Sequence, residues 1–255
     1  MFNRSSFAVF FLSALFAVSL FAGPEALAQD DPMVPDTIIV TTPDNQARRM
    51  FNEGQALLRE NDAESALAKF EEGLELDPAS SRNMYGKALA HSELEQESEA
   101  VEAFEAAIEL SQENGDTETL GAAQRALGTI AYRNAVPLLE PFPLPQENAE
   151  QVLPLLQQAE AGQLNNPMLP YQFARTYNAL GQFEDAEQYA MTAVEVGAEE
   201  GEDNSALYYE LGLARVGTGD KEGAREAFEQ AIGGTWGGWA EYQISQLDAE
   251  DGTGG

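Results

Sequence analysis

Apolar residues recur along the first half of the chain at the spacing of amphipathic helices, and the pattern repeats itself. Residues 47–80 and 81–114 align without a gap at a period of 34 residues. Each unit contains two helical stretches around a polar turn, which is Glu60-Asn61-Asp62 in the first unit. Aligned positions keep their size, which indicates helices that pack closely in pairs: Gly54 over Ala88, Ala66 over Ala100, Phe70 over Phe104 and Gly73 over Ala107.

The size pattern resembles the tetratricopeptide repeat, which has small residues at positions 8, 20 and 27, an aromatic residue at 24 and proline at 32. The first unit meets all five positions with Gly54, Ala66, Phe70, Gly73 and Pro78. Two later units, 167–200 and 205–232, match through Ala174, Tyr177, Gly181, Phe183, Ala186 and Ala193, and through Leu211, Gly212, Gly219, Asp220, Ala224, Phe228 and Ala231. The resemblance implies an all-α, right-handed α-solenoid of about five helix pairs within residues 47–247.

The third unit, 121–166, begins like a repeat and then departs from the pattern. It has 46 residues rather than 34. We expect an interrupted repeat in which a Pro-rich loop, 134–147, precedes a second helix of about 147–161. Pro154 is expected to kink that helix or to mark its start. A tolerated surface insertion is the favoured interpretation of the loop, and a binding element is the alternative. The prolines that crowd it are Pro137, Pro141, Pro143 and Pro145.

The end of the chain has a helical pattern at 236–247 that is expected to cover the apolar face of the last repeat. Its large apolar side chains are expected to cap the stack rather than to form a platform for sugar rings: Trp236, Trp239, Tyr242 and Ile244. The polar residues 248–255 are expected to form a disordered tail.

The N-terminus has the pattern of a secretory signal peptide. Residues 7–22 are an uninterrupted apolar run of 16 residues, preceded by Arg4 and followed by Ala26-Leu27-Ala28. This run is short for crossing ~30 Å of hydrocarbon, so cleavage after Ala28 is favoured over an uncleaved anchor. The sequence therefore predicts a signal peptide at 1–28 and a periplasmic or secreted protein without stable membrane insertion after cleavage.

An acidic, Pro-containing linker is expected at residues 29–46. Within it, Asp36 to Thr41 resembles a TonB box, the short segment of outer-membrane transporters that adds as a strand to an energy-transducing partner. A plain tether and a docking strand both remain open for this segment.

Composition narrows the range of functions. The chain has 44 Asp and Glu against 13 Lys and Arg, for a net charge of −31. Such a negative field argues against binding of nucleic acid or anionic lipid. The absence of Cys excludes disulfides, thiolate nucleophiles and zinc ribbons. Many hydrated carboxylates would keep a protein soluble in high salt, so a halophilic source is a hypothesis.

Neither an enzyme nor a metal or cofactor site is predicted. His91 is the only imidazole, and it is accompanied by no G-x-S-x-G, H-E-x-x-H or glycine-rich phosphate loop. A half-buried packing role is expected for it. The run 199–204 clusters oxygen ligands without the order of a calcium loop, and a solvated turn is expected there.

The resemblance implies that first helices line a concave groove and that second helices form its back. Eight of the nine Arg after the signal peptide fall on expected first helices, whereas carboxylates gather on second helices. Arg and Tyr are side chains that anchor interfaces. The residues expected to face the groove are Arg48, Phe51, Gln55, Arg59, Arg82, Tyr85, Arg125, Tyr132, Arg133, Tyr171, Arg175, Asn178 and Tyr209.

These positions lead to the hypothesis of an exported, non-catalytic adaptor or scaffold. Its groove would bind an extended or carboxylate-bearing segment of a protein or peptide partner, such as an envelope or outer-membrane protein. Simple pairing of these Arg with neighbouring Glu is the alternative. A second functional alternative is docking of a TonB-like energy transducer through Asp36 to Thr41. The family's clamp for a C-terminal carboxylate needs Lys and Asn where this chain has Phe51, Gln55 and Gly86, which argues against chaperone-tail binding.

Overall fold

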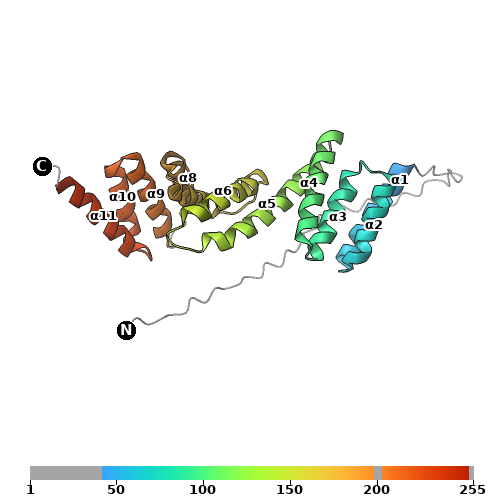
Figure 1. The fold of residues 1–255 in the computed structure, drawn as a ribbon, viewed down its shortest axis with the longest axis horizontal. Helices are drawn as coiled ribbons and strands as arrows, with labels where there is room; N and C mark the ends of the chain where they lie inside the picture. Colours follow the sequence, from blue (N-terminus) through green and yellow to red (C-terminus); the bar gives the residue numbers. More distant parts are fainter. Residues whose placement is uncertain (1–41, 198–202, 253–255) are drawn as a thin grey trace, which may run out of the picture. The chain divides into compact units, whose positions relative to one another are not determined.

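The computed structural model describes residues 42–197 and 203–252, and within these ranges it contains eleven helices and no strand. The helices belong to one compact unit, residues 41–255. Consecutive helices lie side by side in chain order (Figure 1). Their bounds are α1 Pro43–Arg59, α2 Ala63–Leu76, α3 Ser81–Glu93, α4 Glu97–Asn114, α5 Thr117–Leu139, α6 Gln146–Ala161, α7 Leu169–Ala179, α8 Phe183–Gly197, α9 Ser205–Thr218, α10 Lys221–Ala231 and α11 Gly237–Gly252.

Several helices begin where a polar side chain caps the first turn. Such a side chain satisfies one of the backbone N–H groups that have no partner within the helix. Asp62 accepts a hydrogen bond from Ser65 N at the start of α2, and Ser80 accepts one from Asn83 N at the start of α3. Asp116 and Asp220 do the same for α5 and α10. The polar turns of the repeat therefore fix where its helices start.

The repeated small and aromatic positions form the core between the helices. Phe70 is fully buried, and its ring packs against two glycines. A Cβ at Gly54 would stand 2.5 Å from Phe70 Cε1, and Gly86 approaches the same ring from the next pair. A larger residue at either position would push the helices apart, which is the physical reason for the small residues in the pattern.

The helices pair as α1 with α2, α3 with α4, α5 with α6, α7 with α8 and α9 with α10, and α11 packs against α10. The structure is therefore an α-solenoid of five helix pairs with a terminal helix, as the sequence predicts. First helices contact one another from α1 to α3, from α3 to α5 and from α7 to α9. Between the third and fourth pairs the substantial contact is instead that of α6 with α7. The row of first helices thus has two sections.

The third pair differs from its prediction. Helix α5 continues through Pro137 to Leu139, so the loop before α6 is residues 140–145 rather than 134–147. Ala135 and Leu139 are buried against Val152 and Leu156 of α6, and this packing holds the last turn of α5 despite the lost backbone donor of proline. Helix α6 has Pro154 in its interior, so this proline does not mark its start.

Two expected boundaries are also wrong. Helix α1 begins at Pro43, inside the expected linker 29–46, because Thr42 caps it and proline is tolerated in a first helical turn. Helix α11 continues to Gly252, through much of the expected disordered tail 248–255. Ion pairs of Lys221 with Glu250 (2.9 Å) and of Arg225 with Asp248 (2.7 Å) join this end of α11 to α10.

The expected signal peptide, the Asp36 to Thr41 segment and residues 199–202 of the acidic run lie outside the described residues. None of the described helices has the length and apolar character required to span a membrane.

Candidate functional site

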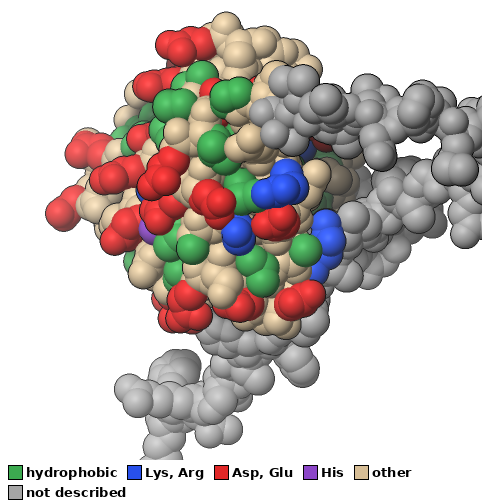
Figure 2. All heavy atoms as spheres, turned by 90° about the vertical axis from the view of Figure 1, so that its right-hand side faces the viewer, with side chains coloured by type: hydrophobic (Ala, Val, Ile, Leu, Met, Phe, Trp, Pro, Cys, Tyr) green, Lys and Arg blue, Asp and Glu red, His purple; other side chains and the backbone are tan. Residues whose placement is uncertain are grey.

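The arginines lie on the helices that the repeat pattern predicts. Arg48, Arg49 and Arg59 are on α1, and only Arg225 is on a second helix, α10. The others on first helices are Arg82 on α3, Arg125 and Arg133 on α5, Arg175 on α7 and Arg215 on α9. On the face drawn in Figure 2, acidic side chains are widely spread, while Lys and Arg lie toward one side.

We call the surface of α1, α3 and α5 the open section. It contains the expected groove residues Arg48, Phe51, Gln55, Arg59, Arg82, Tyr85, Arg125, Tyr132 and Arg133. Arg48, Arg59 and Arg125 are exposed, and none of them forms an ion pair with a described residue. Phe51, Gln55, Tyr85 and Tyr132 are half-buried beside them.

A cavity of about 210 Å³ lies between α1 and α3 in the open section. Arg48, Phe51 and Arg82 are among its lining residues, and Phe51 also packs against Phe70 at 6.0 Å between ring centroids. Farther along, burial raises the pKa of Tyr85, and the positive charge of Arg125 partly opposes this shift. Among the described residues, the open section thus combines exposed guanidinium groups that form no ion pair with partly exposed aromatic surface.

Other arginines are paired within the chain, as the alternative interpretation expected. Arg82 Nε is 3.3 Å from Asp116 Oδ2, and Arg133 Nη2 is 2.5 Å from Glu97 Oε2. Burial opposes the charge on Asp116, but hydrogen bonds from Thr119 and Ser81 and the nearby Arg82 hold its pKa below the ordinary value. These pairs join each first helix to a neighbouring repeat.

We call the surface of α7 and α9 the covered section. Its expected groove residues are Tyr171, Arg175, Asn178 and Tyr209. Tyr171, Arg175 and Tyr209 have exposed fractions of 7%, 8% and 3%, so the expectation that they are open to a partner is wrong for these three side chains. The α5–α6 loop and the start of α11 contact this surface.

The α5–α6 loop is held by both its backbone and its side chains. Arg175 donates from Nη1 to Leu139 O (3.1 Å) and from Nη2 to Pro141 O (3.0 Å). The ring of Phe142 meets Trp236 at 4.4 Å, Trp239 at 5.3 Å and Tyr209 at 6.1 Å between centroids. The loop thus links the third repeat to the C-terminal helix across the covered section.

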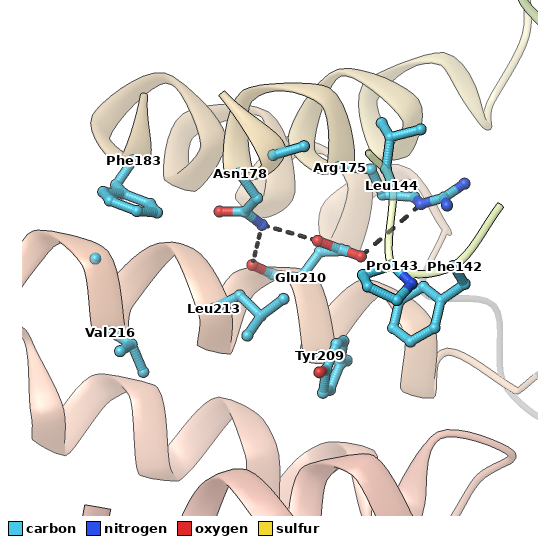
Figure 3. Close-up of a pocket in the computed structure, with 12 residues that line it drawn as sticks. Phe142, Pro143, Leu144, Arg175, Asn178, Phe183, Tyr209, Glu210, Leu213 and Val216 are labelled. Carbon is cyan, nitrogen blue, oxygen red and sulfur yellow. Dashed lines mark hydrogen bonds and ion pairs between the residues drawn. The ribbon is translucent and has the colours of Figure 1, made fainter. Parts of the chain in front are cut away.

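A buried polar network lies under this loop (Figure 3). Asn178 Nδ2 donates to Glu210 Oε2 at 2.8 Å and to Glu210 O at 3.0 Å. Arg175 Nε is 3.9 Å from Glu210 Oε1. Burial raises the pKa of Glu210 to about 7, although the hydrogen bond from Asn178 and the charge of Arg175 both act to lower it. Glu210 therefore stands near the midpoint of its titration at neutral pH.

A cavity of about 310 Å³ adjoins the network. The loop contributes Phe142, Pro143 and Leu144 to its lining, and α7, α8 and α9 contribute the rest (Figure 3). Asn178 Oδ1 is buried at this cavity and accepts no hydrogen bond from any described residue. The lining is otherwise mainly apolar, so the cavity suits an apolar side chain beside one hydrogen-bond donor.

The described residues contain no cluster of His, Asp and Glu that could hold a metal ion. His91 is half-buried on α3, as expected, and its Nδ1 lies 2.7 Å from Gln96 Oε1. Asp203, at the end of the acidic run, accepts hydrogen bonds from Thr235 N (2.8 Å) and Ser205 N (3.0 Å) rather than facing only solvent. The hydroxyl groups of Ser205 and Thr235, together with these backbone N–H groups, hold the pKa of Asp203 below its ordinary value. The bonds also join the start of α9 to the turn before α11.

Sequence reasoning missed Phe142 and Glu210. The only signal for Phe142 was an aromatic residue between two prolines in a unit longer than its neighbours. Glu210 gave no signal, because the sequence alone predicts that a carboxylate on a first helix is exposed. Its burial is seen only when the packing of the neighbouring helices is known.

The Tetratricopeptide repeat family matches residues 51–115 and 171–238, which together exceed half of the chain. The chain belongs to the tetratricopeptide repeat family. Such repeats form scaffolds for protein–protein interaction. The two matched segments leave out all of α5 and α6, the unit that departs from the sequence pattern.

Several solved structures are similar to this chain. The crystal structure of YrrB, "a TPR protein with an unusual peptide-binding site", is 22% identical, covers 78% of this chain and 92% of its own, and has a TM-score of 0.44. MamA from Desulfovibrio magneticus RS-1 is 20% identical, covers 74% of this chain and 94% of its own, and has a TM-score of 0.41. A comparison with curated proteins gives no significant match.

Proposed function

We propose that this tetratricopeptide repeat protein is an exported, non-catalytic adaptor that binds an extended, carboxylate-bearing segment of a partner protein on its open section. The observation that carries this proposal is the exposure of Arg48, Arg59 and Arg125, without ion pairs among the described residues, on the first helices of a chain with a net charge of −31.

The described residues include seven Lys and Arg that pair with another repeat or with the terminal helix, whereas Arg48, Arg59 and Arg125 form no such pair. Acidic partners are repelled by most of the surface, so exposed guanidinium groups that form no ion pair with a described residue would determine where they bind. Guanidinium groups bind carboxylates through paired hydrogen bonds, and half-buried Phe51 and Tyr85 offer apolar contact beside them. Because exposed charges are screened by salt, this binding should weaken as ionic strength rises.

The proposal is tested with the double variant Arg48→Glu, Arg125→Glu in a quantitative pull-down from the envelope of the source cells. We expect recovery of the bound partner to fall at least about tenfold, since both attractive contacts become repulsive. The matched control is Lys69→Glu, Arg225→Glu, which makes the same change in net charge on the second helices α2 and α10.

Equal recovery by the double variant and the parent would contradict the proposal, provided that both melt at the same temperature. Deletion of residues 29–41 separates it from docking through Asp36 to Thr41. That deletion leaves binding to the open section intact, whereas docking of a TonB-like partner through the N-terminal segment would be lost.

A further inference from the structure

The covered section holds part of its own chain in the way that a groove holds a peptide. Arg175 binds the segment through two backbone carbonyl groups, Leu139 O and Pro141 O, rather than through its side chains. Backbone contacts of this kind position a segment without depending on its sequence. Recognition of the side chains is left to the rings around Phe142.

Phe142 is the side chain that the covered section recognises. Tyr209, Trp236 and Trp239 surround its ring with edge-on contacts, which are a favourable geometry for aromatic pairs. Phe142 nevertheless remains 37% exposed, and Trp239 remains 51% exposed. The contact therefore lies at the surface, where the ring of Phe142 can leave without opening the helical core.

The loop also leaves part of the site unused. The cavity of about 310 Å³ lies between the loop and α7 and α9, and Asn178 Oδ1 has no hydrogen-bond donor there. A buried acceptor without a partner is costly. A segment that brought both a donor and a larger apolar side chain would satisfy this surface better than the loop does.

We infer that the covered section is a second segment-binding site, specific for a short, bent stretch in which an aromatic residue is followed by proline. Phe142, Pro143 and Leu144 of the same chain occupy this site, and a partner segment of the same kind binds by displacing them. The inference rests on the proposed function as a segment-binding scaffold, but it concerns different residues from those of the open section.

Proline fits this role because it lacks a backbone N–H and has a restricted backbone, which lowers the entropy lost on binding. Occupation of the site by a segment of the same chain also determines the affinity or concentration that a competing segment needs. A tethered segment has an effective concentration on the order of 1 mM. A partner segment of equal intrinsic affinity therefore displaces it only at millimolar concentration, and a segment that binds more tightly does so at a proportionally lower concentration.

The test uses the full chain with Phe142→Ala and a synthetic peptide that has the sequence of residues 138–147. The chain contains two Trp, Trp236 and Trp239, both beside Phe142, and the peptide has none, so tryptophan fluorescence reports occupation of the site directly. The control peptide has Ala in place of Phe.

We expect a saturable change in fluorescence when the Phe peptide is added to Phe142→Ala, binding at least about tenfold weaker to the parent chain, and no change with the Ala peptide. No binding to a variant with the parent's helical circular dichroism would overturn the inference. Equal binding of the Phe peptide to parent and variant would also overturn it.

A second measurement on the parent chain does not depend on how the variant folds. In a parent chain that has 4-fluorophenylalanine at position 142, peptide at several millimolar should move the fluorine NMR signal toward that of a solvent-exposed ring. An unchanged signal at saturating fluorescence would exclude displacement. The Arg48→Glu, Arg125→Glu variant should bind the peptide like the parent. Failure of the open-section proposal and failure of this one are therefore distinguishable.

Discussion

The open and covered sections are built from equivalent positions of the same repeat, yet they present opposite surfaces. In the open section Arg48 and Arg125 are exposed and unpaired among the described residues. In the covered section Arg175, at another groove position, is buried and bonded to the backbone of a loop from another repeat. The repeat position determines the direction in which a side chain points, but neighbouring parts of the chain determine whether a partner can reach it.

The difference also changes what an arginine does. An exposed guanidinium contributes little to stability and remains available for binding. A buried guanidinium that satisfies two carbonyl groups and lies beside a buried carboxylate is part of the folded structure. Substitutions of arginines at groove-facing positions of the two sections should therefore have very different effects.

The largest effect is expected for Arg175→Ala. This substitution leaves Leu139 O and Pro141 O without their donor and removes the cation beside Glu210, so we expect a loss of about 2–4 kcal/mol in the free energy of unfolding. The matched change Arg48→Ala removes an exposed side chain and should alter stability by no more than about 0.5 kcal/mol. Urea unfolding of both variants measures the difference. Similar losses in the two variants would contradict the distinction between the sections.

A smaller effect, specific to the covered section, is expected for Glu210→Gln as pH changes. The pKa of Glu210 is about 7 in the folded protein against an ordinary value of 4.5, so the folded state holds the proton more tightly than the unfolded state. The stability that this proton contributes is complete below pH 4.5 and is lost as pH rises through 7. Gln remains neutral at every pH. The free energy of unfolding of the variant, relative to that of the parent, should therefore rise by up to about 3 kcal/mol between pH 4.5 and pH 8.

Unfolding free energies measured at several pH values check this prediction. A constant difference between the parent and Glu210→Gln from pH 4.5 to pH 8 would show that burial of Glu210 does not perturb its titration.

Much of the fold could be predicted from the sequence because the repeat is a local pattern. Close packing such as that of Gly54 and Gly86 on Phe70 requires small and aromatic residues at fixed positions of each repeat. The spacing of these residues is therefore enough to predict the helix pairs and to place the arginines on first helices. The contact of Phe142 with Trp236 joins parts of the chain that lie far apart, and no periodicity encodes it. The helical end of α11 depends in the same way on ion pairs with α10.

The candidate site could be predicted only in part for the same reason. Arg48 and Arg125 are exposed because none of the described segments covers them. Arg175 and Tyr209 are instead covered by a loop and a terminal helix that their own repeats do not contain. Burial created by contact between distant segments could not be read from either segment.

The accessibility of the arginines tests the central claim most directly. Phenylglyoxal modifies exposed guanidinium groups, and peptide mass spectrometry gives a rate for each arginine of the intact chain. We predict that Arg48, Arg59 and Arg125 are modified rapidly and that Arg175 is modified at least about tenfold more slowly, since only Arg175 of these four is buried. Modification of Arg175 at the rate of Arg48 would contradict the distinction between an open and a covered section.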